Sequence, residues 1–550
     1  MTVRLDPAYR AAALRNLGGT EFDVLVIGGG VVGAGAALDA ASRGLSVAIV
    51  EAQDWASGTS SRSSKLIHGG LRYLEQLDFK LVREALKERS LLLHRLAPHL
   101  VRPVPFLFPL RHPFWERAYV GTGVLLYDTI GGARALPRHR HLSLRRALEL
   151  APSLRPTALT GAIRYFDAQV DDARLTMMLA RTAAQHGATT LTRTKVTVLQ
   201  RDGDRVTGAR VRDLESGQEL AVRARRVISA TGVWTDEMHE LAGTPGPFQV
   251  RMSKGVHLLV PRDRIQLDTG LIMRTEKSVL FVIPWGDYWI IGTTDTPWES
   301  DKASPTANRA DVDYLLDHVN ELLREPLGRA DIVGVYAGLR PLLAGRSNET
   351  TQLSREHAVA EPVPGLFVVA GGKLTTYRVM AADVVDAAVR GLGGVVASSL
   401  TDRVPILGAV GYDEVWTDRR GIAERSGLPV ATVERLLGRY GSAVTELINL
   451  ISRDAELGEP IAGAEGYLRA EAVYAVTHEG ALSLDDVLSR RTRISIEAAD
   501  RGRRAAESVA RLVAPHLGWD GQAQHAAVAA YRQHIDAELA AQAARDDRAA

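Results

Sequence analysis

The segment 28–33 has the glycine pattern G-x-G-x-x-G and directly follows an apolar run. In this pattern Gly28 permits a tight turn, Gly30 lets the backbone approach a pyrophosphate, and Gly33 lets a helix pack closely on a strand. The N-terminus of a helix that begins here offers unpaired N–H groups and a positive dipole end to the same anion. The pattern therefore predicts a phosphate-binding turn.

The residues around this turn fit a strand–helix–strand unit of a parallel sheet. An apolar strand is expected over 22–27, a helix of small residues over 31–43 and a second apolar strand over 45–50. Glu51 ends the second strand, where an acid accepts hydrogen bonds from a ribose. Together these features predict a dinucleotide site, and the alternative is a glycine-rich turn beside a solvated glutamate. The glycine pattern does not distinguish FAD from NAD.

Segments farther along the chain carry a family resemblance. They are S-S-K-L-I-H-G-G-L-R-Y-L-E (63–75), A-T-G-V-W (230–234), K-G-V-H (254–257), A-G-L-R-P-L (337–342) and G-G-K-L-T-T-Y-R (371–378). In this order the set resembles the FAD-dependent glycerol-3-phosphate dehydrogenases, within the D-amino-acid-oxidase-like flavoproteins. The chain beyond residue 400 is also similar to that family's C-terminal domain. The resemblance implies non-covalently bound FAD as the cofactor.

The resemblance assigns a set of residues to this FAD. The loop after the second strand offers hydroxyl and N–H groups to the pyrophosphate and the isoalloxazine ring, and Val196 borders the adenine. The turn 371–376 directs N–H groups at the flavin's pyrimidine oxygen, where a positive helix end would stabilise the anionic reduced flavin. The implied cofactor-binding residues are Gly28, Gly30, Gly33, Glu51, Thr59, Ser60, Ser63, Ser64, Val196, Gly232, Gly372, Lys373, Leu374, Thr375 and Thr376.

Cationic residues stand in or near the same segments. Guanidinium groups hold a phosphate well because they donate paired hydrogen bonds. A single arginine is more commonly a solvated or ion-paired surface residue, but the resemblance places these cations at the phosphate end of the substrate. The implied substrate-binding residues are Arg72, Tyr73, Arg340, Arg355 and Lys373.

Two histidines are candidates for the catalytic base. An imidazole titrates near neutral pH and can accept the proton of a substrate hydroxyl. His68 in I-H-G-G and His257 in K-G-V-H fit this role about equally well. Lys373, which would polarise a developing carbonyl oxygen, and Arg340 complete the catalytic candidates. We find no metal site with credible ligand spacing in the sequence.

The resemblance implies oxidation of sn-glycerol 3-phosphate to dihydroxyacetone phosphate. Hydride passes from substrate C2 to flavin N5, and the electrons continue to quinone. Three alternatives stay open. The first is a glycerol-3-phosphate oxidase that uses oxygen and releases hydrogen peroxide, and the second is an amino-acid oxidase of the same fold, which needs one arginine for a carboxylate. The third is a non-catalytic flavin-binding or DNA-binding regulator, which leaves the histidines and the cations without a purpose.

The composition limits the kind of protein in which this chemistry takes place. The 550 residues carry a net charge of +2 and contain 46% apolar residues, 24% charged residues and no cysteine. This indicates a globular protein without disulfides, thiolate metal sites or a cysteine nucleophile. The charge balance does not support a nucleic-acid partner. The N-terminus is unlike a signal peptide and no apolar run reaches about 18 residues, so we expect a cytoplasmic protein.

Transfer of electrons to a membrane quinone requires peripheral contact with the cytoplasmic face of the inner membrane. The basic stretches 490–493 and 501–504 and the apolar region 106–115 are candidates for that contact. Segments of these compositions are more commonly a solvated helix face or part of a buried core. The oligomeric state is left open, with a homodimer as one candidate.

The periodicities and the resemblance predict an α/β protein. A Rossmann-type FAD-binding domain is expected to be interleaved with an antiparallel-sheet substrate domain and followed by a C-terminal α-helical domain. The expected bounds are 1–20 for an N-terminal helix, 21–400 for the FAD-binding domain (mainly 21–75, 160–235 and 355–395), about 76–159 and 236–354 for the substrate domain, and 401–550 for the helical domain. We also expect a helix over 71–96 and a meander with strands at 195–200, 205–212, 219–222 and 227–230.

Overall fold

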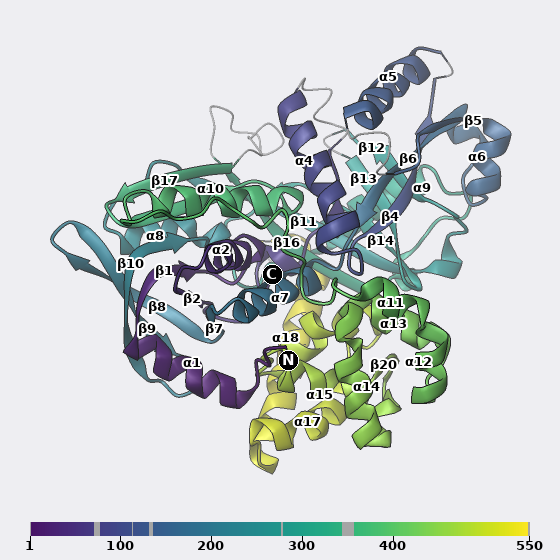
Figure 1. The fold of residues 1–550 in the computed structure, drawn as a ribbon. Helices are drawn as coiled ribbons and strands as arrows, with labels where there is room; N and C mark the ends of the chain where they lie inside the picture. Colours follow the sequence, from purple (N-terminus) through teal and green to yellow (C-terminus); the bar gives the residue numbers. More distant parts are fainter. Residues whose placement is uncertain are drawn as a thin grey trace.

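A parallel sheet forms one layer of the molecule (Figure 1). The computed structural model describes residues 2–70, 78–112, 114–130, 136–276, 279–343 and 357–547. The strand order is β17-β18-β10-β1-β2-β7. The strands are β1 (Glu21–Ile27), β2 (Val47–Val50), β7 (Thr189–Leu191), β10 (Glu219–Ser229), β17 (His357–Val363) and β18 (Leu366–Gly371). All neighbours pair in parallel except β17, which is antiparallel to β18. This sheet confirms the Rossmann-type part of the predicted fold.

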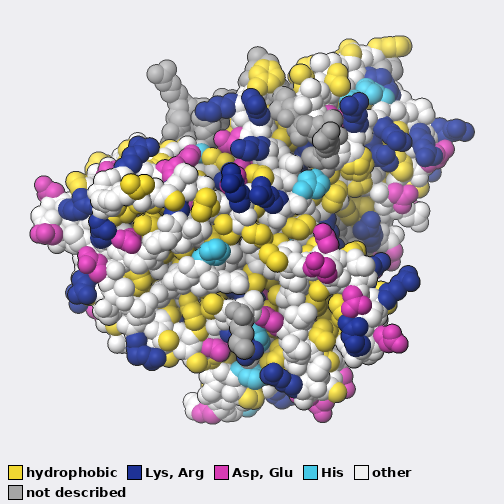
Figure 2. Space-filling view, in the orientation of Figure 1, with side chains coloured by type: hydrophobic (Ala, Val, Ile, Leu, Met, Phe, Trp, Pro, Cys, Tyr) yellow, Lys and Arg dark blue, Asp and Glu magenta, His cyan; other side chains and the backbone are white. Residues whose placement is uncertain are grey.

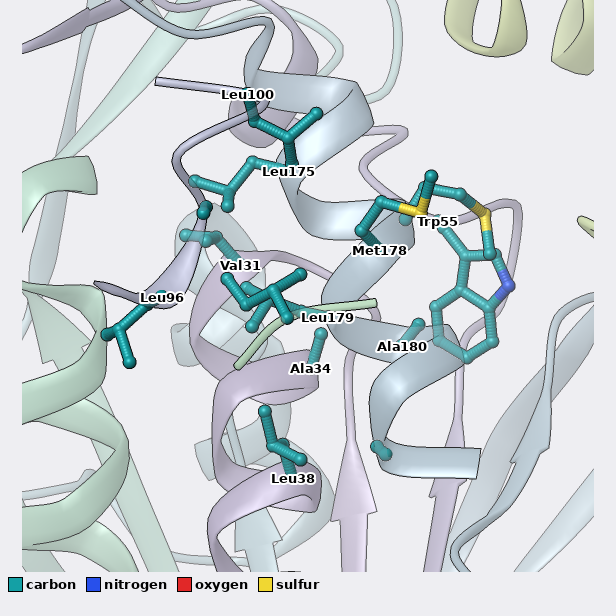
Figure 3. Packing of buried hydrophobic residues seen from close by; sticks show 14 of the residues in the cluster. Val31, Ala34, Leu38, Trp55, Leu96, Leu100, Leu175, Met178, Leu179 and Ala180 are labelled. Atoms are coloured by element: carbon teal, nitrogen blue, oxygen red, sulfur yellow. The ribbon is translucent and has the colours of Figure 1, made fainter. Parts of the chain in front are cut away.

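Helices cover both faces of this sheet. On one face, α2 (Val31–Ser42) packs against α7 (Asp172–Gln185) and α10 (Tyr377–Val389). Figure 3 shows Val31, Ala34 and Leu38 of α2 beside leucines of α7. On the other face, α1 (Pro7–Gly19) buries Ala13 and Leu17 against the sheet. The small residues of α2 let its neighbouring helices approach closely.

A three-stranded meander extends the parallel sheet. It consists of β8 (Thr194–Asp202), β9 (Arg205–Asp213) and the first half of β10. The prediction of separate strands at 219–222 and 227–230 was wrong, because β10 runs without interruption from 219 to 229. Exposed Arg223 and Arg225 alternate with buried residues in β10. In the sequence, these charged residues on the solvent face of the strand were misinterpreted as a turn between two strands.

The second sheet has the order β15-β11-β14-β13-β12-β4-β6-β3, with β16 beside β11 and β5 beside β6. Its pairs are antiparallel except β12 with β4, which fits the predicted antiparallel sheet. The side chain of His257 lies on one face, and α9 (Arg309–Asn320) packs on the other. The strands are β3 (Leu66–Ile67), β4 (Arg102–Leu110), β5 (Arg140–Ser143), β6 (Gly161–Gln169), β11 (Val250–Pro261), β12 (Gly270–Arg274), β13 (Val279–Trp285), β14 (Tyr288–Gly292), β15 (Thr296–Pro297) and β16 (Gly334–Leu343).

Helices outside the two sheets include α4 (Phe79–Leu91) and α5 (Trp115–Ile130), which lie together at the upper edge of Figure 1. Short helices α6 (Leu144–Leu150) and α8 (Thr235–Leu241) complete the first 400 residues. Of the predicted helix 71–96, the part 71–77 lies outside the described residues. The remainder is α4 and a wider helical turn, η2 (Leu92–Leu96).

The C-terminal part confirms the predicted helical domain and occupies the lower right of Figure 1. Its helices are α11 (Tyr412–Thr417), α12 (Arg419–Ser426), α13 (Val430–Tyr440), α14 (Val444–Arg453), α15 (Arg469–Thr477), α16 (Ile494–Glu497), α17 (Arg503–Leu517) and α18 (Gly521–Ala543). A hairpin of β19 (Pro460–Ile461) and β20 (Ala464–Leu468) interrupts them. A helical turn, η11 (Asp486–Arg491), faces α7 of the first domain.

The basic stretch 490–493 lies in the interior of the molecule. Arg490 and Arg491 both donate to the buried carboxylate of Asp54, at 2.6 to 2.8 Å. A buried carboxylate needs such partners because its desolvation is costly. This stretch is therefore ruled out as a membrane contact. Among the described helices, none is long and apolar enough to cross a membrane.

Candidate active site

The segments that the sequence singled out meet at one edge of the parallel sheet. The turn 28–33 follows β1, Glu51 follows β2, Gly232 comes shortly after β10, and the turn 371–376 begins at the end of β18. Because these strands run parallel, their carboxyl ends lie at the same edge. Ligands of open parallel sheets bind at this edge.

The glycine turn has no space for a side chain at Gly28 or Gly33. Gly28 has φ +110°, and a Cβ there would lie 2.7 Å from the carbonyl oxygen of Ala230. A Cβ on Gly33 would collide with the carbonyl oxygen of Gly28. Ser60 accepts a hydrogen bond from the Val31 N–H at 2.9 Å, so the loop after β2 lies against the N-terminus of α2. The backbone of this turn can therefore approach an anion.

Glu51 closes the opposite side of the turn. Its carboxylate accepts hydrogen bonds from the N–H groups of Gly29 at 2.6 Å and Gln53 at 2.7 Å. Burial raises the pKa of Glu51, and these two hydrogen bonds oppose the shift. The backbone of Glu51 accepts from the Thr194 N–H at 2.8 Å, which places Glu51 close to the start of β8 and its buried Val196.

The turn 371–376 reaches His68. Gly371 and Gly372 have φ near +80°, a conformation that favours glycine, and α10 begins directly after the turn. The Thr375 hydroxyl accepts a hydrogen bond from the His68 N–H and lies within donating distance of the His68 carbonyl, both at 3.1 Å. The segments around His68 and Lys373, more than 300 residues apart in sequence, are therefore adjacent in the structure.

The second sheet presents a row of aromatic and imidazole rings to this region. Tyr336, His257, Gly292 and Phe281 are cross-strand partners on β16, β11, β14 and β13. The ring of His68 lies edge-on to Phe281, with 6.4 Å between ring centroids. A Cβ on Gly292 would collide with the ring of His257. The structure thus brings both candidate histidines to one face of one sheet.

His257 is enclosed on several sides. Its side chain is 2% exposed, its ring stacks on Tyr336 at a centroid distance of 4.7 Å, and its Nε2 is 2.8 Å from the Ser64 hydroxyl. Burial lowers the pKa of His257 well below its usual range, and the nearby cations Arg340 and Lys65 lower it further. His257 is therefore a neutral imidazole at neutral pH.

Arg340 lies on the same sheet at the β16 position opposite Ser253. Its guanidinium donates to the Thr293 hydroxyl at 3.0 Å and to the Thr294 carbonyl at 3.2 Å, and it pairs with Asp295 at 3.7 Å. These contacts hold the side chain beside the end of β14. Its charge is close enough to His257 to contribute to the lowered pKa of that residue.

Comparisons with known proteins agree with this arrangement. The family model for FAD dependent oxidoreductases matches residues 23–387, and the model for the C-terminal domain of alpha-glycerophosphate oxidase matches residues 399–524. Glycerol-3-phosphate dehydrogenase 2 of Mycobacterium tuberculosis is 56% identical over 99% of this chain and 93% of its own length. The chain belongs to the FAD-dependent glycerol-3-phosphate dehydrogenases. The resemblance inferred from the motifs is confirmed.

Other members of this glycerol-3-phosphate dehydrogenase family match over most of the chain. The mitochondrial enzyme of Homo sapiens is 36% identical over 94% of this chain and 74% of its own length. The glycerol-3-phosphate dehydrogenase from Bacillus halodurans, solved in complex with FAD, is 29% identical with a TM-score of 0.79, and the match covers 97% of this chain and 98% of that chain.

FAD is the cofactor of the family, and the strand-end segments of this chain fit it. In the turn 28–33, close backbone contacts exclude side chains at Gly28 and Gly33. Gly30, the N-cap of α2, has no side chain to cap the helix. Ser60 accepts from the Val31 N–H, and the other N–H groups of the first turn can receive a pyrophosphate. The carboxylate of Glu51 has further lone pairs toward a ribose.

The hydroxyl side chains of the loop after β2 that were predicted to bind FAD make different contacts in the structure. Thr59 donates to the Leu339 carbonyl at 2.6 Å, and Ser60 accepts from the N-terminus of α2. Ser63 donates to Asp172 at 2.7 Å, whereas Ser64 contacts His257. Gly232, with φ +57°, begins the turn before α8. The remaining candidates, Arg72, Tyr73 and Arg355, lie outside the described residues.

Sequence reasoning missed residues that support this site. Tyr336 stacks on His257, and Asp172 binds the loop that carries Ser64. Tyr336 stands between motif segments, so no pattern singled it out. Asp171 and Asp172 at the start of a helix are common capping residues, which concealed the second role of Asp172. Only the long-range pairing could have identified them.

Proposed function

We propose that this chain oxidises sn-glycerol 3-phosphate to dihydroxyacetone phosphate and passes the electrons on to quinone. The observation that carries the proposal is the hydrogen bonding between Thr375 in the predicted flavin turn and the backbone of His68. This hydrogen bonding brings the predicted flavin turn next to the face of the second sheet that carries Arg340 and His257. The names of the relatives that match the full chain support the substrate.

Bound FAD supplies the hydride acceptor for substrate C2. The chain supplies orientation, charge and a proton acceptor. Arg340 holds the phosphate, so that remote binding energy positions the reacting carbon. Lys373 lies at the end of β18 in the turn that contacts His68, where its charge would polarise the carbonyl oxygen as it forms.

We assign the base to His68 rather than His257. A general base must come within hydrogen-bonding reach of the substrate hydroxyl. His257 is buried between Tyr336 and Gly292, and Ser64 occupies its Nε2. His68 is only partly buried and lies between the flavin turn and Phe281. On this proposal His68 accepts the C2 hydroxyl proton, and His257 holds Ser64 in place.

Anaerobic titration of the purified FAD-loaded protein with glycerol 3-phosphate tests the proposal. Loss of the oxidised flavin absorbance is expected, with slow recovery in air and fast recovery on addition of a quinone analogue. Fast recovery in air would instead identify the oxygen-dependent oxidase. If glycerol 3-phosphate leaves the absorbance unchanged, the substrate assignment is wrong.

Substitution Arg340→Ala is expected to weaken substrate binding while FAD stays bound. Loss of a guanidinium that pairs with a buried phosphate costs about 2–5 kcal/mol, so the KM for glycerol 3-phosphate should rise about 30-fold or more. Steady-state kinetics with a dye acceptor measures the change. Arg340→Lys, which keeps the charge, should raise KM less. An unchanged KM in Arg340→Ala would remove this residue from the phosphate site.

Quinone reduction requires contact with a membrane, and we propose that the outer side of α5 makes it. Apolar side chains are exposed on and next to this helix: Phe114 (85%), Trp115 (60%), Tyr119 (51%), Leu125 (56%) and Leu126 (40%). Figure 2 shows hydrophobic side chains along the upper edge, where Figure 1 places α5. The neighbouring α4 exposes Lys80, Arg83 and Lys87. Apolar groups beside cations suit an anionic lipid surface.

The double substitution Trp115→Glu with Leu125→Glu is expected to reduce binding to anionic phospholipid vesicles at least about tenfold, because charges replace apolar contacts with the lipid. Vesicle sedimentation measures the bound fraction. The control is Val410→Glu, which places a charge at a side chain that is 72% exposed in the C-terminal domain. Equal sedimentation of both variants would show that α5 is not the membrane contact.

A further inference from the structure

The C-terminal domain reaches the loop that leads into His68. Arg493 lies between η11 and α16 and is 3% exposed. Its Nη2 is 2.5 Å from an oxygen of Asp171 and 2.6 Å from an oxygen of Asp172, both at the N-terminus of α7. Its Nη1 also donates to the Ser61 carbonyl at 3.3 Å. One guanidinium therefore connects the helical domain, α7 and the loop after β2.

Asp172 joins Arg493 to a short turn, residues 63–65. One carboxylate oxygen accepts from the Ser63 N–H at 2.9 Å and from the Ser63 hydroxyl at 2.7 Å. The other accepts from the buried Lys65 ammonium at 2.8 Å. Lys65 has φ +58°, a left-handed conformation that a lysine adopts only when its surroundings hold it. Asp172 thus binds both ends of this turn.

The turn 63–65 contacts His257 and lies just before His68 in the chain. The Ser64 hydroxyl is 2.8 Å from Nε2 of His257, and the Ser63 carbonyl accepts from the Tyr336 hydroxyl at 3.0 Å. The chain then continues through the two residues of β3 to His68. A displacement of this turn would therefore move Ser64 and the backbone that carries His68.

The charges around Arg493 leave it little freedom to move. Burial alone would raise the pKa of Asp171, but Arg493 and Arg439 outweigh burial and hold it far below its usual range. The two carboxylates face Arg493, Arg439 and Lys65, and of this group Asp172, Lys65 and Arg493 are buried. Removing one cation from such a group leaves a buried carboxylate without its partner, so the remaining residues must rearrange.

We propose that Arg493 is a positioning residue of the active site. Through Asp172 it fixes the turn 63–65, and with it Ser64, His257 and the start of the segment that carries His68. The C-terminal domain thereby supports the active site through Arg493. This inference rests on the proposed function, because the readout is reduction of the flavin by glycerol 3-phosphate.

The test compares Arg493→Met and Arg493→Lys in the full-length, FAD-loaded protein. Anaerobic stopped-flow measures the rate of flavin reduction at saturating glycerol 3-phosphate, and KM is measured with a dye acceptor. Misplacement of reacting groups by about 1 Å costs up to about 100-fold in rate, so Arg493→Met should reduce the flavin about 10- to 100-fold more slowly with KM little changed. Lysine keeps the charge but lacks the fork that binds Asp171, Asp172 and Ser61 together, so Arg493→Lys should fall between wild type and Arg493→Met.

Arg181→Met is the matched control. Arg181 is a buried cation on α7, the helix whose N-terminus Arg493 contacts, and it contacts Tyr474 and Glu446 of the C-terminal domain away from the turn. It should lower the melting temperature without changing the reduction rate. A wild-type rate in Arg493→Met, or in Arg493→Lys if the methionine variant does not fold, overturns the proposal. If glycerol 3-phosphate does not reduce the wild-type flavin, the proposed function fails instead.

Discussion

Substitution of His68 by asparagine is expected to lower the rate of flavin reduction by glycerol 3-phosphate about 10²- to 10⁴-fold, the usual contribution of a general base. Asparagine keeps a polar side chain between the flavin turn and Phe281 but cannot accept the hydroxyl proton. The backbone hydrogen bonds between His68 and Thr375 do not involve the imidazole. FAD should therefore remain bound, and anaerobic stopped-flow at saturating substrate isolates the chemical step.

The comparison with His257→Asn decides between the two histidines. His257 is neutral, buried and hydrogen bonded to Ser64, so its loss should disturb positions rather than remove the base. A decrease of about tenfold is expected from such misplacement. If His257→Asn proves far slower than His68→Asn, the base is His257 and the buried ring must become accessible when substrate binds.

Substitution Gly33→Ala is expected to abolish FAD binding. The added Cβ would collide with the carbonyl oxygen of Gly28, which is backbone and cannot turn aside as a side chain would. Either α2 or the turn 28–33 must move, and overpacking of this kind costs about 1–3 kcal/mol or more. The N–H groups that would face the pyrophosphate move with the helix. The purified variant should therefore lack the flavin absorbance of the wild-type protein.

Gly19→Ala is the control for this change. Gly19 ends α1 and is exposed, and a Cβ added there would have nothing within 4 Å. This variant should retain FAD and stability close to wild type, because surface substitutions away from special features have small effects. Full FAD occupancy in Gly33→Ala would contradict the assignment of the 28–33 turn to the pyrophosphate.

Local sequence was sufficient for the parts of the site that depend on neighbouring residues. The turn 28–33 lies between a strand and a helix that are adjacent in the chain, and Gly33 is required by its contact with the Gly28 carbonyl within that unit. The turn 371–376 likewise follows its own strand. Such signals are short-range, so residue type and spacing carry them. The roles of the individual residues in FAD and substrate binding stay predictions.

Sequence patterns were less informative where their interpretation depended on whether a side chain is exposed or buried. The basic stretch 490–493 has the composition of a surface patch, yet Arg490 and Arg491 neutralise Asp54 in the interior. Charged residues on β10 interrupted its apolar pattern and concealed a continuous strand. In both cases the position of the side chain relative to solvent depends on partners far away in the sequence.

Amino-acid type and order alone therefore determine that the chain contains a dinucleotide-binding unit, a second sheet and a helical C-terminal domain. They cannot rank His68 against His257, nor connect Arg493 with the loop 63–65. Those relations arise where β3, β11, α7 and η11 come together. Burial, charge pairing and hydrogen-bond reach are properties of that three-dimensional arrangement, because they depend on distances between groups that the chain brings together only when it folds.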